Sequence, residues 1–308
     1  MDQRRARHRS VWPRLAAVPR SWLRLGLVAL ALAGLSALVG AGWAVVSVRR
    51  RPRGHDVVVR MSSRQARPLS ADQADPDGPP PVVLVHGLGM SSRSMAPLVR
   101  ALGRTTWTLA PDLPGYGRSP QPRLGMLGLD ELAGTLLRWM DHQGIQEAVL
   151  VGHSVGAQVA GEVAVMAPGR VRALVMVAPT GDPERPSVLR QSLNLLRGAV
   201  HEPPLLIPVA GLDYLIAGPG QMVALMRRAV QQVPLQLDVT MAVPLLVVRG
   251  SRDRVCSQDW CERLVAVTAD SRLEVVDGSA HGIVYRAPHE LVTLIRDVVL
   301  ADRTAGPA

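Results

Sequence analysis

Apolar residues along this chain fall into short runs that alternate with longer amphipathic stretches. Runs rich in Val and Leu predict β-strands at 81–87, 106–112, 147–154, 173–179, 244–250 and 273–278. The intervening stretches with helical spacing predict helices at 129–142, 155–166, 259–267 and 288–300. Near-continuous apolar strands that alternate with helices are typical of a parallel sheet covered on both faces. The predicted fold class is therefore α/β, with a mostly parallel, doubly wound sheet.

The alternation is interrupted at residues 180–243. This stretch has many more residues than an ordinary connection between core strands. We call 180–243 the inserted segment; it divides the core into 81–179 and 244–300. Helix-like spacing occurs at 187–200 and 220–233, on either side of a strongly apolar stretch. These features predict a helical lid over an apolar substrate. The alternative is a set of extra helices that extend the core.

A second apolar feature lies near the N-terminus, where residues 25–48 contain no charge. As a helix they would span about 36 Å, enough to cross a hydrocarbon core of about 30 Å. The run is longer than the apolar region of a signal peptide, and arginines rather than a small-residue cleavage site follow it. We expect one uncleaved transmembrane helix between an Arg-rich tail at 1–24 and a linker with an edge strand at 49–80. Residues 301–308 form a C-terminal tail.

The net charge of +10 does not indicate nucleic-acid binding, because the excess is local. Seven arginines lie in residues 1–24 and seven more between Arg49 and Arg67, on both sides of the apolar run. They suit a membrane partner better than a nucleic-acid groove, which would interleave basic and aromatic residues. Their near balance leaves orientation open, with a preference for an extracytoplasmic C-terminal domain. The sequence does not indicate an oligomeric state.

The two cysteines, Cys256 and Cys261, allow two interpretations. They would close a small disulfide loop in an oxidising compartment, which would agree with an extracytoplasmic domain, or they are two ordinary thiols. They lack the histidine spacing of a zinc site, so we expect no metal.

Candidate chemistry begins at Ser154, in the sequence "VGHSVGA" where a predicted strand becomes a predicted helix. In a parallel sheet, functional side chains lie beyond the carboxyl ends of the strands. A serine in so sharp a turn requires residues without side chains two positions before and after it, and Gly152 and Gly156 meet this requirement. The pattern predicts a nucleophile elbow at Ser154.

A serine hydroxyl needs a base, and the base needs an orienting carboxylate. His281 follows the predicted strand 273–278, and Asp253 follows the strand 244–250, so both should lie at the same sheet edge as Ser154. Asp182 and Asp277 are rival acids. Asp277 lies at the strand end itself, only four residues before His281, so we prefer Asp253.

A loop at the end of the first core strand, "HGLGM" (86–90), is the candidate for binding a developing oxyanion. We expect the N–H groups of Leu88 and Val155 to form the oxyanion hole. His86, Gly87 and His153 are expected to support the loop and the elbow rather than to carry protons. Asp112 should shape a nearby turn, and His289 should lie on the surface of a helix.

Together these motifs resemble the α/β-hydrolase fold superfamily over residues 57–299. The resemblance rests on "HGLGMSS" (86–92), "DLPGYGRS" (112–119), "GHSVGA" (152–157), "GSRDRV" (250–255) and "GSAHG" (278–282), which follow the family's order. It implies a serine hydrolase without a cofactor, of the esterase or lipase kind, that cleaves a carboxylic ester, thioester or amide through an acyl-enzyme. The serine argues against the haloalkane dehalogenase and epoxide hydrolase branches, which have aspartate at this position.

Three alternatives remain on the same fold: a cofactor-free perhydrolase (haloperoxidase-like), a C–C bond hydrolase and a non-catalytic binding protein. The sequence departs from the family pattern at the N-terminal hairpin. Residues 55–63 predict a strand, but its hairpin partner would have to come from the proline-containing stretch 66–72.

Overall fold

The fold is built on a seven-stranded sheet with the order β1-β3-β2-β4-β5-β6-β7. The computed structural model describes residues 58–62, 79–122, 127–184, 187–218, 225, 227–229, 243–266 and 268–301. All of them belong to one compact unit, Val46–Ala308. The strands are β1 (Val58–Ser62), β2 (Val82–Val85), β3 (Thr108–Asp112), β4 (Ala148–His153), β5 (Val171–Val177), β6 (Leu245–Gly250) and β7 (Ser271–Val276).

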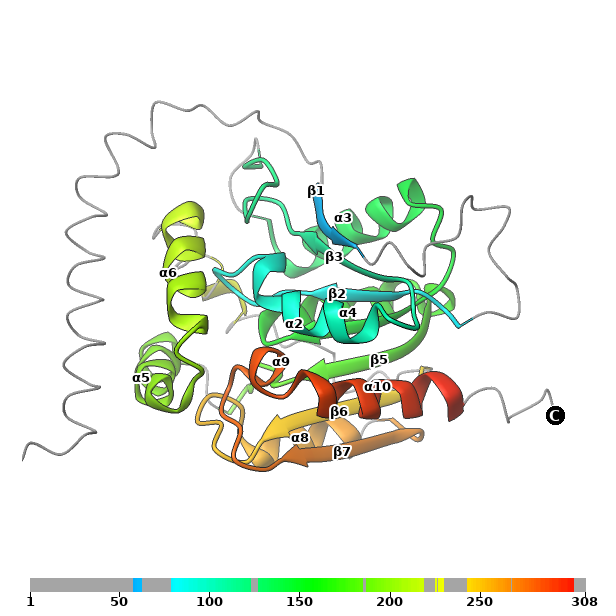
Figure 1. The fold of residues 1–308 in the computed structure, drawn as a ribbon. Coiled ribbons are helices and arrows are strands. Elements are labelled where there is room, and N and C mark those ends of the chain that lie inside the picture. Colours follow the sequence, from blue (N-terminus) through cyan, green and yellow to red (C-terminus); the bar gives the residue numbers. More distant parts are fainter. Residues whose placement is uncertain are drawn as a thin grey trace, which may run out of the picture. The chain divides into compact units, whose positions relative to one another are not determined.

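Helices cover both faces of this sheet, as Figure 1 shows. On one face α2 packs against α9 and α10, whereas α3, α4 and α8 lie behind the sheet in this view. The helices are α2 (Ala96–Leu102), α3 (Leu129–His142), α4 (Val155–Met166), α5 (Val188–Gly198), α6 (Leu206–Ala217), α8 (Gln258–Ala266), α9 (Ile283–Arg286) and α10 (Pro288–Ala301). Short 3-10 turns are η3 (Ser92–Met95), η4 (Pro168–Arg170) and η5 (Ala199–His201).

Strands β2 to β7 run parallel, and each follows one of the apolar runs of the sequence. Every residue of β2, β3 and β4 is buried, as expected for strands covered on both faces. Helices α3 and α4 begin and end where their apolar spacing predicts. The predicted α/β class with a mostly parallel sheet is confirmed.

The sheet edge differs from the expectation of an N-terminal hairpin. β1 does form within 55–63, but it pairs antiparallel with β3, in a register that places Val58 opposite Asp112 and Ser62 opposite Leu109. The expected hairpin partner at 66–72 lies outside the described residues. The physical reason is that β3 leaves an open edge, and an antiparallel strand can complete such an edge of a parallel sheet.

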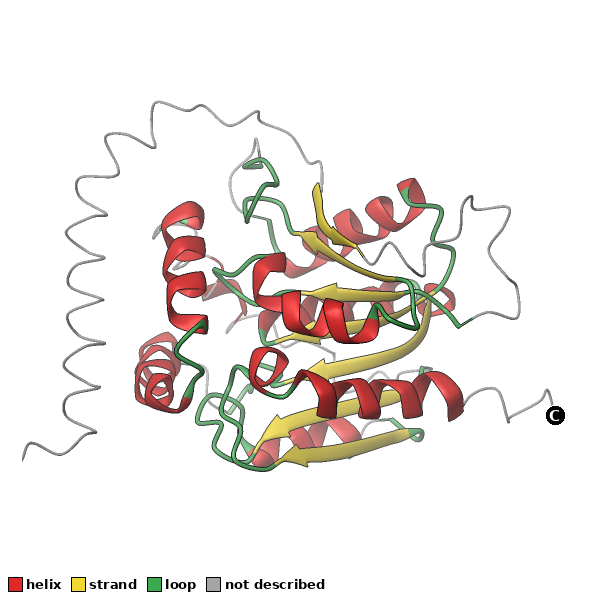
Figure 2. Cartoon of the chain, in the orientation of Figure 1, coloured by secondary structure: helices red, strands yellow, loops and turns green. Residues whose placement is uncertain are grey.

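The inserted segment contributes α5 and α6, which lie on the side of the sheet toward which the parallel strands point (Figure 2). The helix predicted at 187–200 corresponds to α5 and η5. Most of the helix predicted at 220–233 lies outside the described residues, which include only 225 and 227–229 of it. Gln158 of α4 holds one of these residues, because its side-chain amide donates to the Ala229 carbonyl at 2.9 Å.

The predicted membrane helix at 25–48 and the N-terminal tail lie outside the described residues, as does the C-terminal tail apart from Ala301, the last residue of α10. Within the part of the chain that the structure describes, no helix has both the length and the apolar character needed to cross a bilayer.

Candidate active site

Ser154 occupies the sharp turn between β4 and α4, with φ 56° and ψ −121°. Positive φ is costly for a residue with a side chain, and here the Ser154 N–H helps to hold it by donating to the Val177 carbonyl of β5 at 2.9 Å. Gly152 and Gly156 make the turn possible. A Cβ at Gly156 would overlap the carbonyl oxygens at the end of β2, and one at Gly152 would overlap the main chain of the first turn of α4.

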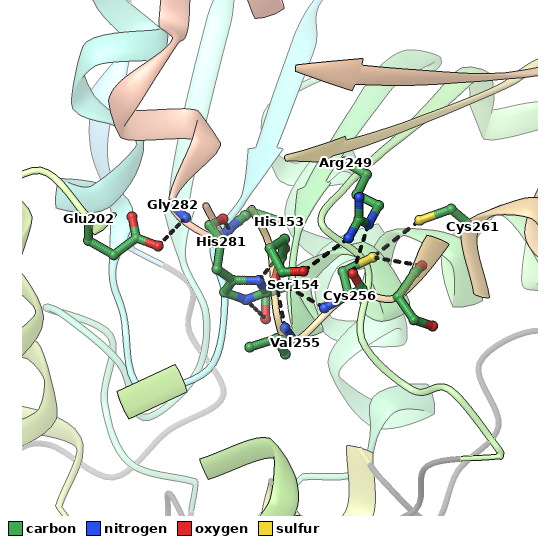
Figure 3. Close-up of polar contacts among 11 residues, drawn as sticks. His153, Ser154, Glu202, Arg249, Val255, Cys256, Cys261, His281 and Gly282 are labelled. Carbon is green, nitrogen blue, oxygen red and sulfur yellow. Dashed lines mark hydrogen bonds and ion pairs between the residues drawn. The ribbon is translucent and has the colours of Figure 1, made fainter. Parts of the chain in front are cut away.

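His281 lies between Ser154 and Asp253 in one hydrogen-bonded chain, and Figure 3 shows His281 next to Ser154. Its Nε2 is 3.0 Å from the Ser154 Oγ, and its Nδ1 is 2.9 Å from Asp253 Oδ2. Because a carboxylate only accepts, Nδ1 carries the proton, and Nε2 is left to accept from the hydroxyl. The structure thus brings together the three side chains that the sequence predicts as nucleophile, base and orienting acid.

Both carboxylate oxygens of Asp253 have partners, and those of Oδ1 lie in the same loop after β6. While Oδ2 faces His281, Oδ1 accepts from the N–H groups of Val255 at 2.7 Å and Cys256 at 3.1 Å. The Arg249 guanidinium stabilises the same loop, because it donates to the carbonyls of Asp253 at 3.0 Å and Cys256 at 2.9 Å. The carboxylate therefore has a fixed orientation before any substrate binds.

Burial and charge act in opposite directions on this pair. Burial raises the pKa of Asp253, but the neighbouring His281 and the two N–H donors outweigh it and leave the pKa below its usual value. Burial lowers the pKa of His281, but the Asp253 carboxylate outweighs it and leaves the pKa above 6.5. The site therefore makes the imidazole a stronger base than free histidine and stabilises the imidazolium that proton transfer would create.

The predicted oxyanion loop lies directly against Ser154. A Cβ at Gly87 would lie 3.1 Å from the Ser154 Cβ. Only glycine therefore fits at this position unless neighbouring atoms move. Leu88 follows in a turn closed by the Met90 N–H, which donates to the Gly87 carbonyl at 3.2 Å. Val155 is the first residue of α4, where helical geometry leaves the N–H without an intrahelical acceptor. The two predicted donors thus belong to the two backbone segments that meet at Ser154.

The sequence pattern of the alpha/beta hydrolase family matches residues 82–294, more than half of the chain. The chain belongs to the alpha/beta hydrolase family. This result confirms the family resemblance, and the matched region contains the whole of the site described above.

Curated relatives of this alpha/beta hydrolase match it only in part. It is 40% identical over 100 residues to the dihydrolipoyllysine-residue acetyltransferase component of the acetoin cleaving system from Cupriavidus necator, which covers 32% of this chain and 26% of that protein. The chain spans about a quarter of the length of such relatives.

Solved structures share the fold over a longer region. A thermophilic esterase from Thermogutta terrifontis has a TM-score of 0.61 at 22% identity, covering 71% of this chain and 89% of its own. A membrane phospholipase A, described as a bacterial virulence factor, has a TM-score of 0.66 at 20% identity, covering 94% of this chain and 100% of its own. At these identities the likeness concerns the fold.

The two supporting histidines of this hydrolase hold loops in place. His86 accepts from the Leu113 N–H at Nε2, at 3.0 Å, so its Nδ1 donates to the Gly87 carbonyl at 2.9 Å. His153 Nε2 lies 2.9 Å from the His281 carbonyl and donates to it. Burial lowers the pKa of both rings, that of His153 to about 4, so both are neutral near pH 7.

The other candidates from the sequence lie away from His281 or have other partners. Asp277 is bonded to the Ser251 hydroxyl at 2.9 Å, on the exposed side of the loop. Asp182 pairs with Arg263 of α8 at 2.7 Å. The buried carboxylate of Asp112 accepts from main-chain N–H groups on both sides and shapes the turn, as expected. His289 is exposed on α10, also as expected.

Two acids of the inserted segment belong to the surroundings of the site, although the sequence does not single them out. Glu202 accepts from the N–H of Gly282, the residue after His281, at 2.9 Å. Asp213 of α6 is buried and pairs with Arg93 of η3, just after the oxyanion loop. Their sequence signal is weak: one acid beside two prolines, and one acid within a strongly apolar stretch.

The cysteines are present as two buried free thiols, with their sulfurs 3.2 Å apart. Burial and the neighbouring Cys261 raise the pKa of Cys256 well above its usual range. Among the described residues, no group of three or more His, Cys, Asp or Glu side chains is arranged to hold a metal ion.

Proposed function

We propose that this alpha/beta hydrolase is a serine hydrolase that cleaves a carboxylic ester, thioester or amide of an apolar substrate through an acyl-enzyme. The observation that carries the proposal is the chain of hydrogen bonds from Ser154 Oγ through His281 to Asp253. It begins at a strained elbow, where the hydroxyl is held next to two backbone segments with N–H donors. An esterase and a phospholipase share this fold. The proposal that this chain also hydrolyses esters rests on the side chains of this chain itself.

In the first half of the reaction, Ser154 Oγ attacks the carbonyl carbon while His281 Nε2 takes the hydroxyl proton. The carbonyl oxygen becomes an oxyanion, which the N–H groups of Leu88 and Val155 stabilise. The imidazolium then gives its proton to the leaving alcohol, thiol or amine, and the acyl group remains on Ser154. A water molecule repeats these steps on the acyl-enzyme, releases the acid and restores the hydroxyl.

The preference for an apolar substrate is supported by the surface of the inserted segment, which acts as a lid in this proposal. Most of the exposed large apolar side chains of the described residues lie on it: Leu189, Leu193, Leu196, Leu205, Ile207 and Leu212. Such surface is costly in water and suits contact with acyl chains or lipid. A medium-chain or lipid-like ester is the substrate class we expect.

Residues 25–48 form the membrane anchor in this proposal, with the hydrolase domain outside the cytoplasm. Its support is the run of 24 residues without a charge, flanked by arginines. Alkaline extraction should leave the full chain in the membrane fraction, whereas a chain without 1–48 should be released. In intact cells, added protease should digest the hydrolase domain; protection of that domain would reverse the orientation.

The test of the activity is hydrolysis of a series of p-nitrophenyl esters of increasing acyl length by the full chain and by Ser154→Ala. We expect kcat/KM to rise with chain length and to fall by about 10⁴-fold or more in the variant. Labelling of Ser154 by a fluorophosphonate should occur only in the wild type. Equal rates for both proteins, without labelling, would favour a binding protein on a hydrolase fold.

A further inference from the structure

Glu202 joins the inserted segment to the loop that carries His281. It follows η5, and its Oε1 accepts from the Gly282 N–H at 2.9 Å (Figure 3). The side chain is mostly buried, and burial raises its pKa. A carboxylate in such surroundings is costly, so its position needs an explanation beyond packing.

The absence of a side chain at Gly282 leaves room for this carboxylate. A Cβ at Gly282 would overlap Glu202 Oε2 and would lie 2.8 Å from a Leu206 methyl carbon. The backbone of Gly282 has φ −81° and ψ 42°, so positive φ is not the reason for glycine. Glycine instead permits the close approach of Glu202 to the residue that follows His281.

The charge of Glu202 distinguishes it from a simple hydrogen-bond acceptor. A glutamine would accept from Gly282 equally well without a charge to bury. His281 is faced by Asp253 from the loop after β6, by His153 from β4 and by Glu202 from the inserted segment. Burial lowers the pKa of His281; Asp253 outweighs it, and Glu202 acts in the same direction as Asp253.

The pKa of Glu202 is itself raised by burial and partly held down by the Gly282 N–H and by His281. The effect is mutual: the anion of Glu202 and the cation of His281 favour each other.

We propose that Glu202 is a positioning residue for His281: it fixes the loop that carries His281 through the Gly282 N–H, and it adds a second carboxylate to the surroundings of the imidazole. The inference rests on the proposed function. When Ser154 attacks and its proton moves to Nε2, the imidazolium is stabilised by Asp253 and by Glu202. Without the Glu202 carboxylate, His281 keeps Asp253 but its loop loses the hydrogen bond at the Gly282 N–H, and the imidazole becomes a weaker base.

The test is the pH dependence of the second-order rate at which a fluorophosphonate labels Ser154 in the full chain. This rate reports the basicity of His281 without requiring the physiological substrate. On the acid side of the pH–rate curve, which we call the acid limb, the rate falls as His281 becomes protonated. In Glu202→Gln the acid limb should move to lower pH by about half a unit or more, because the imidazolium loses a neighbouring negative charge. For a half-unit shift the plateau rate should fall by up to about threefold, because a weaker base removes the serine proton less effectively.

Two further variants separate charge from position. Gly282→Ala keeps the charge of Glu202 but displaces the carboxylate. This variant should therefore also shift the acid limb to lower pH. Glu184→Gln is the matched control: this acid of the inserted segment is exposed and pairs with Arg263 at 3.0 Å, away from His281. Its curve should superimpose on that of the wild type.

A Glu202→Gln curve with an unchanged acid limb would overturn the proposal, even if the plateau fell, because a purely structural role would lower the rate alone. Absence of labelling in the wild type would count against the proposed function instead. In that case the His281 imidazole is titrated by NMR, with His281→Gln for assignment. An equal pKa of His281 in wild type and Glu202→Gln would then overturn the inference.

Discussion

Asp213 on α6 and Arg93 on η3 form an ion pair that ties the inserted segment to the end of the oxyanion loop. Asp213 Oδ1 accepts from Arg93 Nη2 at 2.5 Å and from Nε at 2.9 Å, while Oδ2 accepts from the Ser91 hydroxyl at 2.7 Å. The Asp213 side chain is 1% exposed and the Arg93 side chain 21%. The acid therefore has a partner on each oxygen in an almost dry environment.

Asp213→Ala should lower the free energy of unfolding by about 2–3 kcal/mol. Loss of one partner of a buried pair typically costs about 3–5 kcal/mol, and water that reaches Arg93 reduces the penalty. Urea unfolding of Asp213→Ala, Arg93→Ala and the double variant measures the coupling between them. The double variant should be little less stable than Asp213→Ala; purely additive losses would mean that the two residues act independently.

Asp253→Asn should reduce ester turnover by about 10⁴-fold, because the two N–H donors at Oδ1 retain the amide oxygen and leave the amide NH2 facing His281 Nδ1, which must then accept. Asp277→Asn is the control, since Asp277 is exposed and bonded to Ser251. It should remain within about twofold of the wild type, the range expected for a surface change. Steady-state kinetics of both variants compares the two acids directly, and a larger loss in Asp277→Asn would assign the orienting role to that residue.

Gly156→Ala should destabilise the protein by about 3 kcal/mol, since the added methyl group meets main chain that has no room to move. Gly169→Ala gives the comparison: a Cβ there meets nothing within 4 Å. Its unfolding free energy should change by less than about 1 kcal/mol. Thermal unfolding of the two variants measures the difference, and equal midpoints would show that the elbow does not require glycine at 156.

His153 should make stability depend on pH in the acid range. Its pKa is about 4 in the folded protein, below the ordinary 6.5, because burial disfavours the charged ring. The unfolded chain thus binds the proton more readily, and stability decreases as pH falls from about 6.5 to about 4, by about 3 kcal/mol in total. Below pH 4 the penalty is constant, and above pH 6.5 it is absent.

His153→Gln removes this titration while keeping an amide donor for the His281 carbonyl. Unfolding free energies of wild type and variant between pH 7 and 4 should therefore diverge, with the wild type losing more stability. Parallel curves would show that the His153 ring is not protonated more readily in the unfolded state.

The core of the site can be predicted from sequence because its determinants appear as short motifs. Gly152 is required by the main chain of the first turn of α4 and Gly156 by the end of β2, but both show in the sequence as one motif around Ser154. Asp253 and His281 follow strands whose apolar runs are unambiguous. Parallel strands end at the same edge of a sheet, so the order of elements alone brings these side chains near one another.

Contacts made across the fold cannot be predicted in the same way. Glu202 and Asp213 are ordinary acids in the sequence, and their partners Gly282 and Arg93 lie 80 and 120 positions away. The pairing of β1 with β3 likewise depends on which sheet edge is open, a property of the assembled fold. Periodicity describes which face of an element is apolar, but not which neighbour covers it.

Two of the contacts between the inserted segment and the core lie close together in the sequence of that segment and have a mechanical consequence. Glu202 holds it at the main chain after His281, and Asp213 holds it at η3. The stretch 202–213 is therefore clamped at both ends, and its departure from the core requires breaking a backbone hydrogen bond and an ion pair together.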